Sequence, residues 1–237
     1  MSQFDRTIQM LGEEAQQILS ESHVAVFGLG GVGGSCAEAL ARAGIGQMDI
    51  FDGDTVDLTN LNRQVIALHS TIGQPKAEVC KTRLKDINPL LRVSAYQVFY
   101  DANNADLFPF DAYDIVIDCI DTVSSKLLII ERARRLGIPV LSCMGTGNKL
   151  DIRRFKISPI EKTSVCPLCR VMRTECKKRG FTGVRVLWSD EEPINPLKKR
   201  TPGSVSFVPP AAGMMLAGEA IRLLLAGKKD SDGKPDQ

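Results

Sequence analysis

The sequence predicts an α/β protein of the Rossmann type, with a mainly parallel central sheet and helices on both faces. A short run of Val, Ala and Phe at 24–27 is typical of a buried strand, and the glycine-rich turn 28–33 follows it directly. Further strand patterns alternate with helical patterns between residues 37 and 157. The glycine turn predicts a nucleotide site, because free N–H groups at the start of the next helix favour an anion. By itself it does not distinguish nicotinamide, flavin, methyl-donor and ATP enzymes.

Length and composition are typical of one soluble domain. The 237 residues are 43% hydrophobic and 24% charged, and the formal net charge is only +2. Only local basic clusters can therefore indicate a nucleic acid. The N-terminus does not resemble a signal peptide, and no apolar run reaches the roughly 18 to 20 residues of a membrane span. We expect a cytoplasmic protein without a membrane segment, one domain over residues 1–226 and a disordered tail over 227–237.

Periodicity and turn residues place the elements in order. The segment 1–20 is expected to form an amphipathic helix or helix pair, interrupted at Gly12. Further helices are expected at 33–43, 77–87, 124–136, 166–180 and 211–225, and strands at 47–51, 92–99, 113–118, 137–144, 151–157, 184–188 and 204–208. The proline-rich segment 190–203 is predicted to be a mobile crossover loop.

Asp52 closes the second strand about 20 residues after the glycine turn. A carboxylate at this position of a Rossmann-type fold accepts hydrogen bonds from ribose hydroxyls. Asp52-Gly53-Asp54 could instead be only a turn, but its place at the end of a strand favours ribose binding. The first candidate nucleotide contacts are Gly28, Gly30, Gly31, Gly33, Asp52 and Asp54.

The polar segment 55–76 distinguishes between cofactors. Asn60, Arg63 and Gln64 follow the ribose carboxylate, and Lys76 precedes the next helix. Two cations with amides suit a triphosphate under attack, because the charge on the phosphoryl oxygens must be neutralised during displacement. A dinucleotide pyrophosphate is usually met by a helix terminus alone. Each residue alone could be an ordinary surface residue, but in this order they favour ATP.

A second acidic cluster ends the strand 113–118. Asp118 and Asp121 lie at its carboxyl end, where ligands bind in open α/β sheets, and Thr122 follows as a further candidate nucleotide contact. Asp121 is a candidate Mg²⁺ ligand, because a hard cation that bridges phosphate oxygens commonly takes one or two carboxylates. It could instead be a helix N-cap. Beyond the next strand, the Gly145-Thr146-Gly147 loop would let a substrate carboxylate approach the backbone.

Together these motifs resemble the adenylating superfamily of ubiquitin-activating enzymes, ThiF and MoeB. The matching segments are the glycine turn 28–33, Asp52-Gly53-Asp54, Asn60-Leu61-Asn62-Arg63-Gln64, Gly73-Gln74-Pro75-Lys76-Ala77 and Asp118-Cys119-Ile120-Asp121. The resemblance implies that Asp52 holds the ribose of ATP and that Asp121 orients Mg²⁺. It implies that phosphates are held by Asn60, Arg63 and Lys76. It further implies a homodimer in which Arg6 reaches into the partner's catalytic site. It also implies that the loop 190–203 orders over substrate.

Within this superfamily the chain is most similar to the tRNA threonylcarbamoyladenosine dehydratase branch. The similarity rests on the segments 62–69, 121–126, 144–151 and 162–168. It implies that the threonyl carboxylate of the modified adenosine in tRNA is adenylated with release of pyrophosphate. An internal nucleophile would then close a ring and release AMP, so that the nucleoside is dehydrated. A sulfur-acceptor protein is a candidate partner.

Three other functions are alternatives to this one. Within the superfamily, the alternative is adenylation of the C-terminal glycine of a ubiquitin-like sulfur-carrier protein, which predicts a zinc site and a transfer cysteine. A nicotinamide dehydrogenase would not need the set Asn60, Arg63 and Lys76. A non-catalytic tRNA-binding scaffold would have no use for Asp121.

The seven cysteines are an odd number and do not indicate a disulfide framework. Four of them are expected to be reduced and buried in core segments: Cys36, Cys80, Cys119 and Cys143. Cys166 and Cys169 stand where MoeB-like relatives carry half of a zinc site, but no second Cys-x-x-Cys follows. Cys176 could be a third thiolate ligand, although a helical repeat explains its spacing equally well. We expect neither zinc nor a redox role here.

The predicted helix 166–180 is basic. Its cations are Arg170, Arg173, Lys177, Lys178 and Arg179. The helix could be an ordinary solvated face. Together with the cluster Lys198-Lys199-Arg200, it could instead bind tRNA phosphates.

Overall fold

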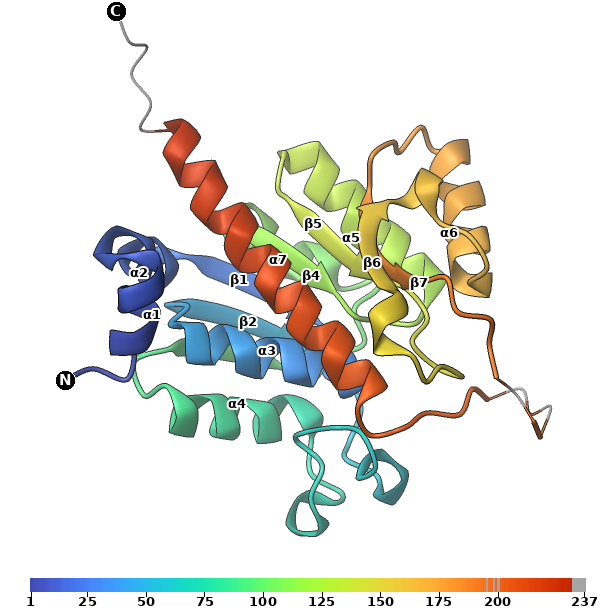
Figure 1. Cartoon of the computed structure of the whole chain (residues 1–237), viewed down its shortest axis with the longest axis horizontal. Coiled ribbons are helices and arrows are strands. Elements are labelled where there is room, and N and C mark those ends of the chain that lie inside the picture. Colours follow the sequence, from blue (N-terminus) through green and yellow to red (C-terminus); the bar gives the residue numbers. More distant parts are fainter. Residues whose placement is uncertain (195, 198, 200, 232–237) are drawn as a thin grey trace, which may run out of the picture.

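A computed structural model of the chain describes residues 1–194, 196, 197, 199 and 201–231. Its centre is a seven-stranded sheet in the order β3-β2-β1-β4-β5-β7-β6 (Figure 1). The strands are β1 (His23–Phe27), β2 (Gln47–Phe51), β3 (Arg92–Tyr96), β4 (Ile115–Asp118), β5 (Val140–Cys143), β6 (Phe155–Pro159) and β7 (Arg185–Ser189). All neighbouring strands pair in parallel except β6, which is antiparallel to β7. The mainly parallel sheet predicted from the sequence is confirmed.

Helices cover both faces of the sheet. They are α1 (Asp5–Leu11), α2 (Glu13–Glu21), α3 (Gly31–Ala43), α4 (Lys76–Ile87), α5 (Val123–Leu136), α6 (Pro167–Lys178) and α7 (Val208–Ser231). Successive strand residues point to opposite faces. Val24 and Val26 therefore pack into one core with α3, α4 and α7, while Ala25 and Phe27 pack into another with α5. A third apolar cluster joins α5, α6 and β7.

The helix boundaries follow the local signals in the sequence. Gly12 separates α1 from α2 and has a φ of 90°, a conformation that favours glycine. Gly44 ends α3 in the left-handed region, as the sequence predicts. The strand expected at 151–157 begins later, at Phe155, because Asp151 accepts a hydrogen bond from Arg153 N (3.0 Å) and starts a short 3₁₀ turn.

The strand predicted at 204–208 is wrong. Its β-branched and aromatic residues favour a strand, but Val208 already starts α7. Pro209 and Pro210 occupy the first turn of that helix, where a missing N–H costs nothing. Ser204 instead lies beside the segment that follows β2, where its carbonyl oxygen accepts a hydrogen bond from Asn62 Nδ2 (3.1 Å).

The disordered tail predicted at 227–237 is wrong for its first residues, because α7 continues to Ser231; residues 232–237 lie outside the described part of the chain.

By length and composition, the segment Val208–Gly227 of α7 could also be a membrane span, and 50% of that window is buried inside the protein. The helix crosses the sheet and packs along α3 (Figure 1). Glu219 and Arg222 form an ion pair on it (2.9 Å). A buried core helix can be as long and as apolar as a membrane span, so length and composition do not distinguish the two.

Candidate active site

A cleft of about 470 Å³ opens at the carboxyl ends of β1, β2 and β4. Parallel sheets bind ligands at this edge. The predicted site residues that line the cleft are Gly28, Gly30, Gly31, Asp52, Asp54, Asn60, Arg63, Gln64, Lys76, Asp121 and Thr122. These residues come from separate loops, so the fold brings together nearly the whole predicted set.

Gly33 is the exception within the glycine turn, since it does not line the cleft. A Cβ atom at Gly33 would lie 1.7 Å from the carbonyl oxygen of Gly28, so the residue allows α3 to pack closely on the end of β1. Gly28 has a φ of 87°, and a Cβ there would lie 2.9 Å from Cys119 O. Together these glycines bring the first N–H groups of α3 to the cleft.

Asp52 ties the glycine turn to the end of β2. Its Oδ2 accepts a hydrogen bond from Leu29 N (2.7 Å), and its Oδ1 accepts one from Asp54 N (2.9 Å). Burial raises the pKa of this carboxyl, while the charge of Lys76 and the two N–H groups oppose the change. The side chain is thus held in place at the cleft wall, where a ribose hydroxyl would meet an acceptor.

Two cations face the cleft from different elements. Lys76 begins α4, and its side chain is only 7% exposed; its Nζ lies 2.9 Å from Asp54 Oδ2. Arg63 Nη1 donates to Thr59 O (2.8 Å) and to Asn62 Oδ1 (2.9 Å). Within the described residues Arg63 has no carboxylate partner, so its charge is available to an anionic ligand.

Two amides complete this side of the cleft. Asn60 Oδ1 accepts a hydrogen bond from Asp57 N (3.1 Å), which leaves its NH₂ group to donate into the cleft. Gln64 is 6% exposed, and its Oε1 has no hydrogen-bond partner among the described residues. A buried acceptor without a partner is costly, so a donor group of a bound ligand would stabilise it.

The two acids after β4 differ in their surroundings. Asp118 is fully buried, and its Oδ2 accepts hydrogen bonds from Lys126 Nζ (3.0 Å) and Ser142 Oγ (2.6 Å). Its Oδ1 accepts one from Ile120 N (3.1 Å), which holds the loop that carries Asp121. Asp121 itself is exposed in the cleft and has no partner in the described part of the chain. The N-cap of α5 is Thr122, so the alternative role of Asp121 as an N-cap is wrong.

The carboxylate of Asp121 suits a divalent cation that takes most of its other ligands from phosphate oxygens and water. Among the described residues, no group of three or more His, Cys, Asp or Glu side chains could hold a metal. Mg²⁺ commonly takes one or two protein carboxylates and completes its shell with phosphate oxygens and water. The donor set around Asp121 therefore suits Mg²⁺ brought in with a nucleotide and does not form a closed metal cage.

The cleft geometry agrees with the comparison to known proteins. Residues 4–235 match the model of the ThiF family. The chain belongs to the ThiF family.

Relatives of this ThiF-family chain include tRNA threonylcarbamoyladenosine dehydratases and a sulfur carrier protein adenylyltransferase. The chain is 40% identical to the tRNA threonylcarbamoyladenosine dehydratase of Bacillus subtilis (strain 168), over 95% of each chain. It superimposes on the crystal structure of the Escherichia coli tRNA N6-threonylcarbamoyladenosine dehydratase in complex with ATP with a TM-score of 0.90 and 33% identity, covering 98% of this chain and 96% of that one. The sulfur carrier protein adenylyltransferase of Thermus thermophilus is 37% identical, but over 56% of this chain and 49% of its own.

Arg6, the remaining predicted catalytic residue of this ThiF-family protein, does not line the cleft. It is exposed on α1, next to α2, which leads into the start of β1. The cleft lies at the opposite ends of the strands (Figure 1). One chain therefore does not bring Arg6 into its own cleft.

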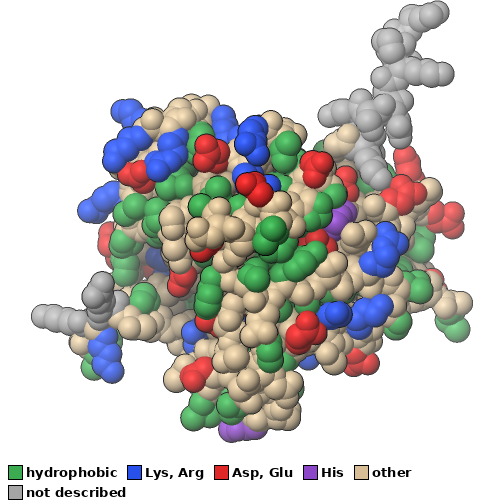
Figure 2. All heavy atoms as spheres, turned by 180° about the vertical axis from the view of Figure 1, so that it is seen from behind, with side chains coloured by type: hydrophobic (Ala, Val, Ile, Leu, Met, Phe, Trp, Pro, Cys, Tyr) green, Lys and Arg blue, Asp and Glu red, His purple; other side chains and the backbone are tan. Residues whose placement is uncertain are grey.

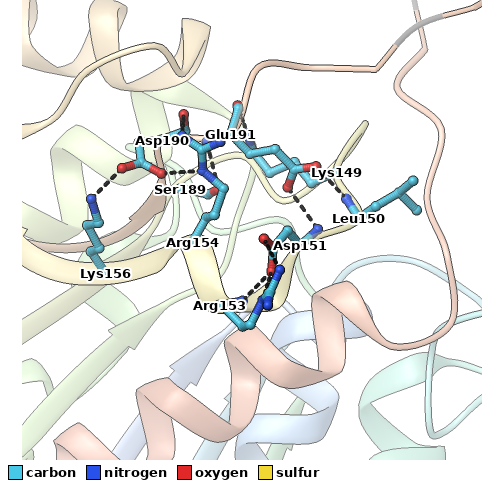
Figure 3. A network of polar contacts seen from close by, with 9 residues as sticks. All are labelled: Lys149, Leu150, Asp151, Arg153, Arg154, Lys156, Ser189, Asp190 and Glu191. Carbon is cyan, nitrogen blue, oxygen red and sulfur yellow. Dashed lines mark hydrogen bonds and ion pairs between the residues drawn. The ribbon is translucent and has the colours of Figure 1, made fainter.

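The crossover segment 190–203 is anchored at both ends. Glu191 accepts hydrogen bonds from Leu150 N (2.9 Å) and Asp151 N (3.0 Å), and Asp190 pairs with Arg154 and Lys156 (Figure 3). Asn148, in the left-handed region (φ 58°), then connects the two ends. Its carbonyl accepts from Ile194 N (2.8 Å), and its Oδ1 accepts from Gly203 N (2.7 Å). Residues 195, 198 and 200 lie outside the described residues, so the mobility of the loop stays a prediction.

The three cysteines near α6 are buried and belong to one apolar cluster. Cys166 occupies the N-cap position of the helix. The neighbouring Cys169 thiol and nearby backbone N–H groups lower the pKa of Cys166, while the interaction between the two thiols raises the pKa of Cys169. Of the four predicted core cysteines, Cys119 alone is only partly buried.

The sequence did not identify several residues of the cleft. Val98, Phe99 and Tyr100 line it because β3 ends at Tyr96, three residues before the predicted end. The ring of Phe99 lies over Gly53, where an added Cβ would be 2.6 Å from Phe99 Cδ2, and the side chain is 68% exposed. Ser204 also lines the cleft, and its buried Oγ has no partner among the described residues. Gly53, beside Asp52, was the sequence feature that could have indicated a ring packed against the backbone at this position.

Proposed function

We propose that this protein is an ATP-dependent tRNA threonylcarbamoyladenosine dehydratase. The observation that carries this is the cleft in which Arg63, Lys76 and Asp121 surround a glycine turn, in a chain with 40% identity to an enzyme of that name over 95% of its length. The cleft has the cations and the free carboxylate that a triphosphate with Mg²⁺ requires. We also propose that residues 1–226 act as one domain in the cytoplasm.

ATP would lie along the glycine turn. Its α-phosphate would meet the first N–H groups of α3, and Asp52 would accept a hydrogen bond from a ribose hydroxyl. The exposed ring of Phe99 offers a flat surface for the base. Asn60, Gln64 and Thr122 would supply the remaining polar contacts to the nucleotide.

The phosphates would be held by Arg63 and Lys76. Lys76 is paired with Asp54 at 2.9 Å, so the triphosphate would share its ammonium group with that carboxylate. Asp121 would hold Mg²⁺, which neutralises charge on the phosphoryl oxygens when bound. In this arrangement the three residues would lie where charge develops as pyrophosphate departs.

The reaction has two steps. An oxygen of the threonyl carboxylate attacks the α-phosphorus, and the bond from that phosphorus to the departing pyrophosphate breaks. An internal nucleophile of the modified nucleoside then attacks the acyl carbon, gives up its proton and expels AMP as the ring closes. The nucleoside thereby loses one water, whose oxygen leaves in AMP, and the protein need not supply a covalent nucleophile. Gly145-Thr146-Gly147, at the rim of the cleft, would position the carboxylate.

We also propose that the enzyme works as a homodimer, in which the partner subunit supplies an arginine from its first helix. Arg6 is exposed on α1 and remote from the cleft of its own chain, which suits a residue that acts on a second copy. A sulfur-acceptor protein remains a proposed partner. Mixing an Arg6→Ala chain with an inactive Arg63→Ala chain tests the dimer, since each mixed dimer would contain one complete site and regain activity.

The central experiment uses purified protein with ATP, Mg²⁺ and tRNA that carries threonylcarbamoyladenosine. We expect mass spectrometry of the nucleosides to show the loss of one water, together with one AMP and one pyrophosphate per product. An unchanged nucleoside mass, with adenylation of the C-terminus of a ubiquitin-like carrier offered in parallel, would overturn the proposal in favour of sulfur-carrier activation.

A further inference from the structure

The helix α6 and its flanks concentrate the positive charge of the protein. Residues 161–180 contain six Lys or Arg residues and two Glu residues, a net charge of +4 in a chain whose total is +2. Figure 2 shows blue side chains gathered over the corner of the molecule that α6 forms. Charge of one sign on a single helix indicates a surface for a polyanion.

The two acidic residues of this segment neutralise little of that charge. Glu175 forms ion pairs with Lys178 (2.8 Å) and Arg179 (2.5 Å) on the C-terminal turn. Glu161 accepts a hydrogen bond from Gly183 N (2.8 Å). Both carboxylates are thus engaged, and four cations of the segment remain without an acidic partner within the described residues: Lys162, Arg170, Arg173 and Lys177.

Arg173 is held in position although it has no acidic partner in the part of the chain that the structure describes. Its Nη1 donates to Thr163 O (2.9 Å) and to Thr163 Oγ1 (2.7 Å). Arg170 and Lys177 are exposed, one turn before and one turn after it on α6. The three side chains therefore form a row of cations along one helix, with the central one fixed to the backbone of the preceding loop.

A groove of about 370 Å³ runs beside this row. Arg173 and Lys177 line it together with Phe181, and the guanidinium of Arg134 lies 5.7 Å from the centre of the Phe181 ring. Proteins that bind single-stranded nucleic acid combine cations that follow the backbone with aromatic rings on which bases stack. The groove offers both features side by side.

The N-terminus of α6 lies next to the loop at the wall of the active-site cleft. A Cβ atom at Gly145 would lie 3.5 Å from Cys166 Sγ, so this end of α6 packs against the loop whose next two residues line the cleft. The 12 residues of α6 form a helix about 18 Å long that begins there. A strand of RNA whose modified nucleoside enters the cleft can therefore continue along α6.

We propose that Arg170, Arg173 and Lys177 form the docking surface for the phosphodiester backbone of tRNA beside the modified nucleoside. This inference rests on the proposed function, because it takes tRNA as the substrate. Cation–phosphate contacts set affinity and register without reading sequence. The surface would hold the RNA so that the threonyl carboxylate reaches the α-phosphate of ATP.

The test compares two variants of equal charge change in the full-length protein. Arg170→Glu/Lys177→Glu reverses two cations of the proposed surface, and Lys81→Glu/Arg92→Glu reverses two on α4 and β3. For the first variant we expect the Kd for tRNA to rise at least about tenfold. The slope of log affinity against log salt should decrease by about 1.4 to 1.8, as for the loss of two phosphate contacts. The Kd for ATP should not change.

The outcomes separate this inference from the proposed function. The inference is wrong if the α6 variant binds tRNA with the wild-type Kd and salt slope, or if the control variant loses as much affinity. Turnover of the wild-type protein on modified tRNA tests the proposed function independently. Wild-type dehydration together with unchanged binding by the α6 variant would overturn the docking surface alone. Circular dichroism of both variants verifies that they are folded.

Discussion

Lys126 Nζ lies 3.0 Å from Asp118 Oδ2, and both side chains are completely buried. Lys126 also donates to the carbonyl oxygen of Cys143 (2.7 Å), at the end of the neighbouring strand. Because Asp118 additionally holds Ile120 N, this ion pair sets the loop that presents Asp121 to the cleft. A buried pair of this kind supports the site without touching the ligand.

Replacing Lys126 with Met should destabilise the protein strongly. The substitution leaves the Asp118 carboxylate buried without its counter-ion, which costs about 3–5 kcal/mol. Equilibrium urea unfolding measures the change. Lys81→Met, on the partly exposed side of α4, is the control and should shift the free energy of unfolding by less than about 0.5 kcal/mol. Equal stability of the Lys126 variant and the wild type would contradict the structural role of the pair.

Asp121→Ala and Arg63→Ala should abolish turnover in folded proteins. Both side chains are solvent-accessible in the cleft, and neither forms an ion pair within the described residues, so their loss should leave the melting temperature nearly unchanged. Dehydration of modified tRNA should fall at least about 100-fold, because each residue is proposed to neutralise charge that develops in the transition state. Asp86→Ala, exposed on α4, should keep full activity. A wild-type rate in either cleft variant would refute its assigned role.

Gly33→Ala should destabilise the protein although alanine favours helices. The new Cβ would lie 1.7 Å from Gly28 O, so the helix must shift, at a cost of about 1–3 kcal/mol. The same shift should weaken ATP binding, since it moves the turn away from the end of β1. Gly218→Ala on α7 is the matched control. Nothing lies within 4 Å of its added Cβ, and it should stabilise the protein by up to about 1 kcal/mol. Thermal unfolding of both variants would reveal the opposite signs.

The thiol of Cys166 should ionise at a lower pH than an ordinary cysteine. Its pKa is lowered from an ordinary value of 9.0, chiefly by its interaction with the Cys169 thiol, whose own pKa is raised. Because the folded-state pKa is depressed, this ionisation contributes stability above pH 9, and the contribution is lost as the pH falls through the folded-state pKa. Ultraviolet thiolate absorbance between pH 4 and 9 should show the transition. Cys169→Ala should raise the midpoint, Cys166→Ser should remove it and Cys176→Ala should leave it in place.

Much of the candidate site could be predicted because it depends on strand ends. The glycine turn follows a buried strand, one acid closes the next strand, and another acid follows a third strand. Each of these features can be read from a few consecutive residues and marks the end of a strand. In a parallel sheet the carboxyl ends of strands meet at one edge. Asp52 and Asp121 are therefore expected at one edge of the sheet, and both line the cleft.

Local patterns could not assign contacts between distant segments. Asp118 and Asp121 look equivalent in sequence, and only packing buries one against Lys126 and leaves the other open to the cleft. The run 204–208 has strand propensity, but the sheet ends at β6, so Ser204 lies at the cleft and Val208 enters α7. Propensity describes how a residue suits a backbone conformation, whereas tertiary packing decides which neighbours are available.

The chain order alone was thus enough to predict the α/β class, a nucleotide site and the acid after β4. The three-dimensional structure decided that Gly33 is a packing residue and that Phe99 and Ser204 join the cleft. It also placed the N-terminus of α6, the helix that carries the row of cations, beside the loop at the cleft wall. The reason is physical, since a motif specifies the conformation of a few consecutive residues, while a binding surface is formed by side chains that only the folded core brings together.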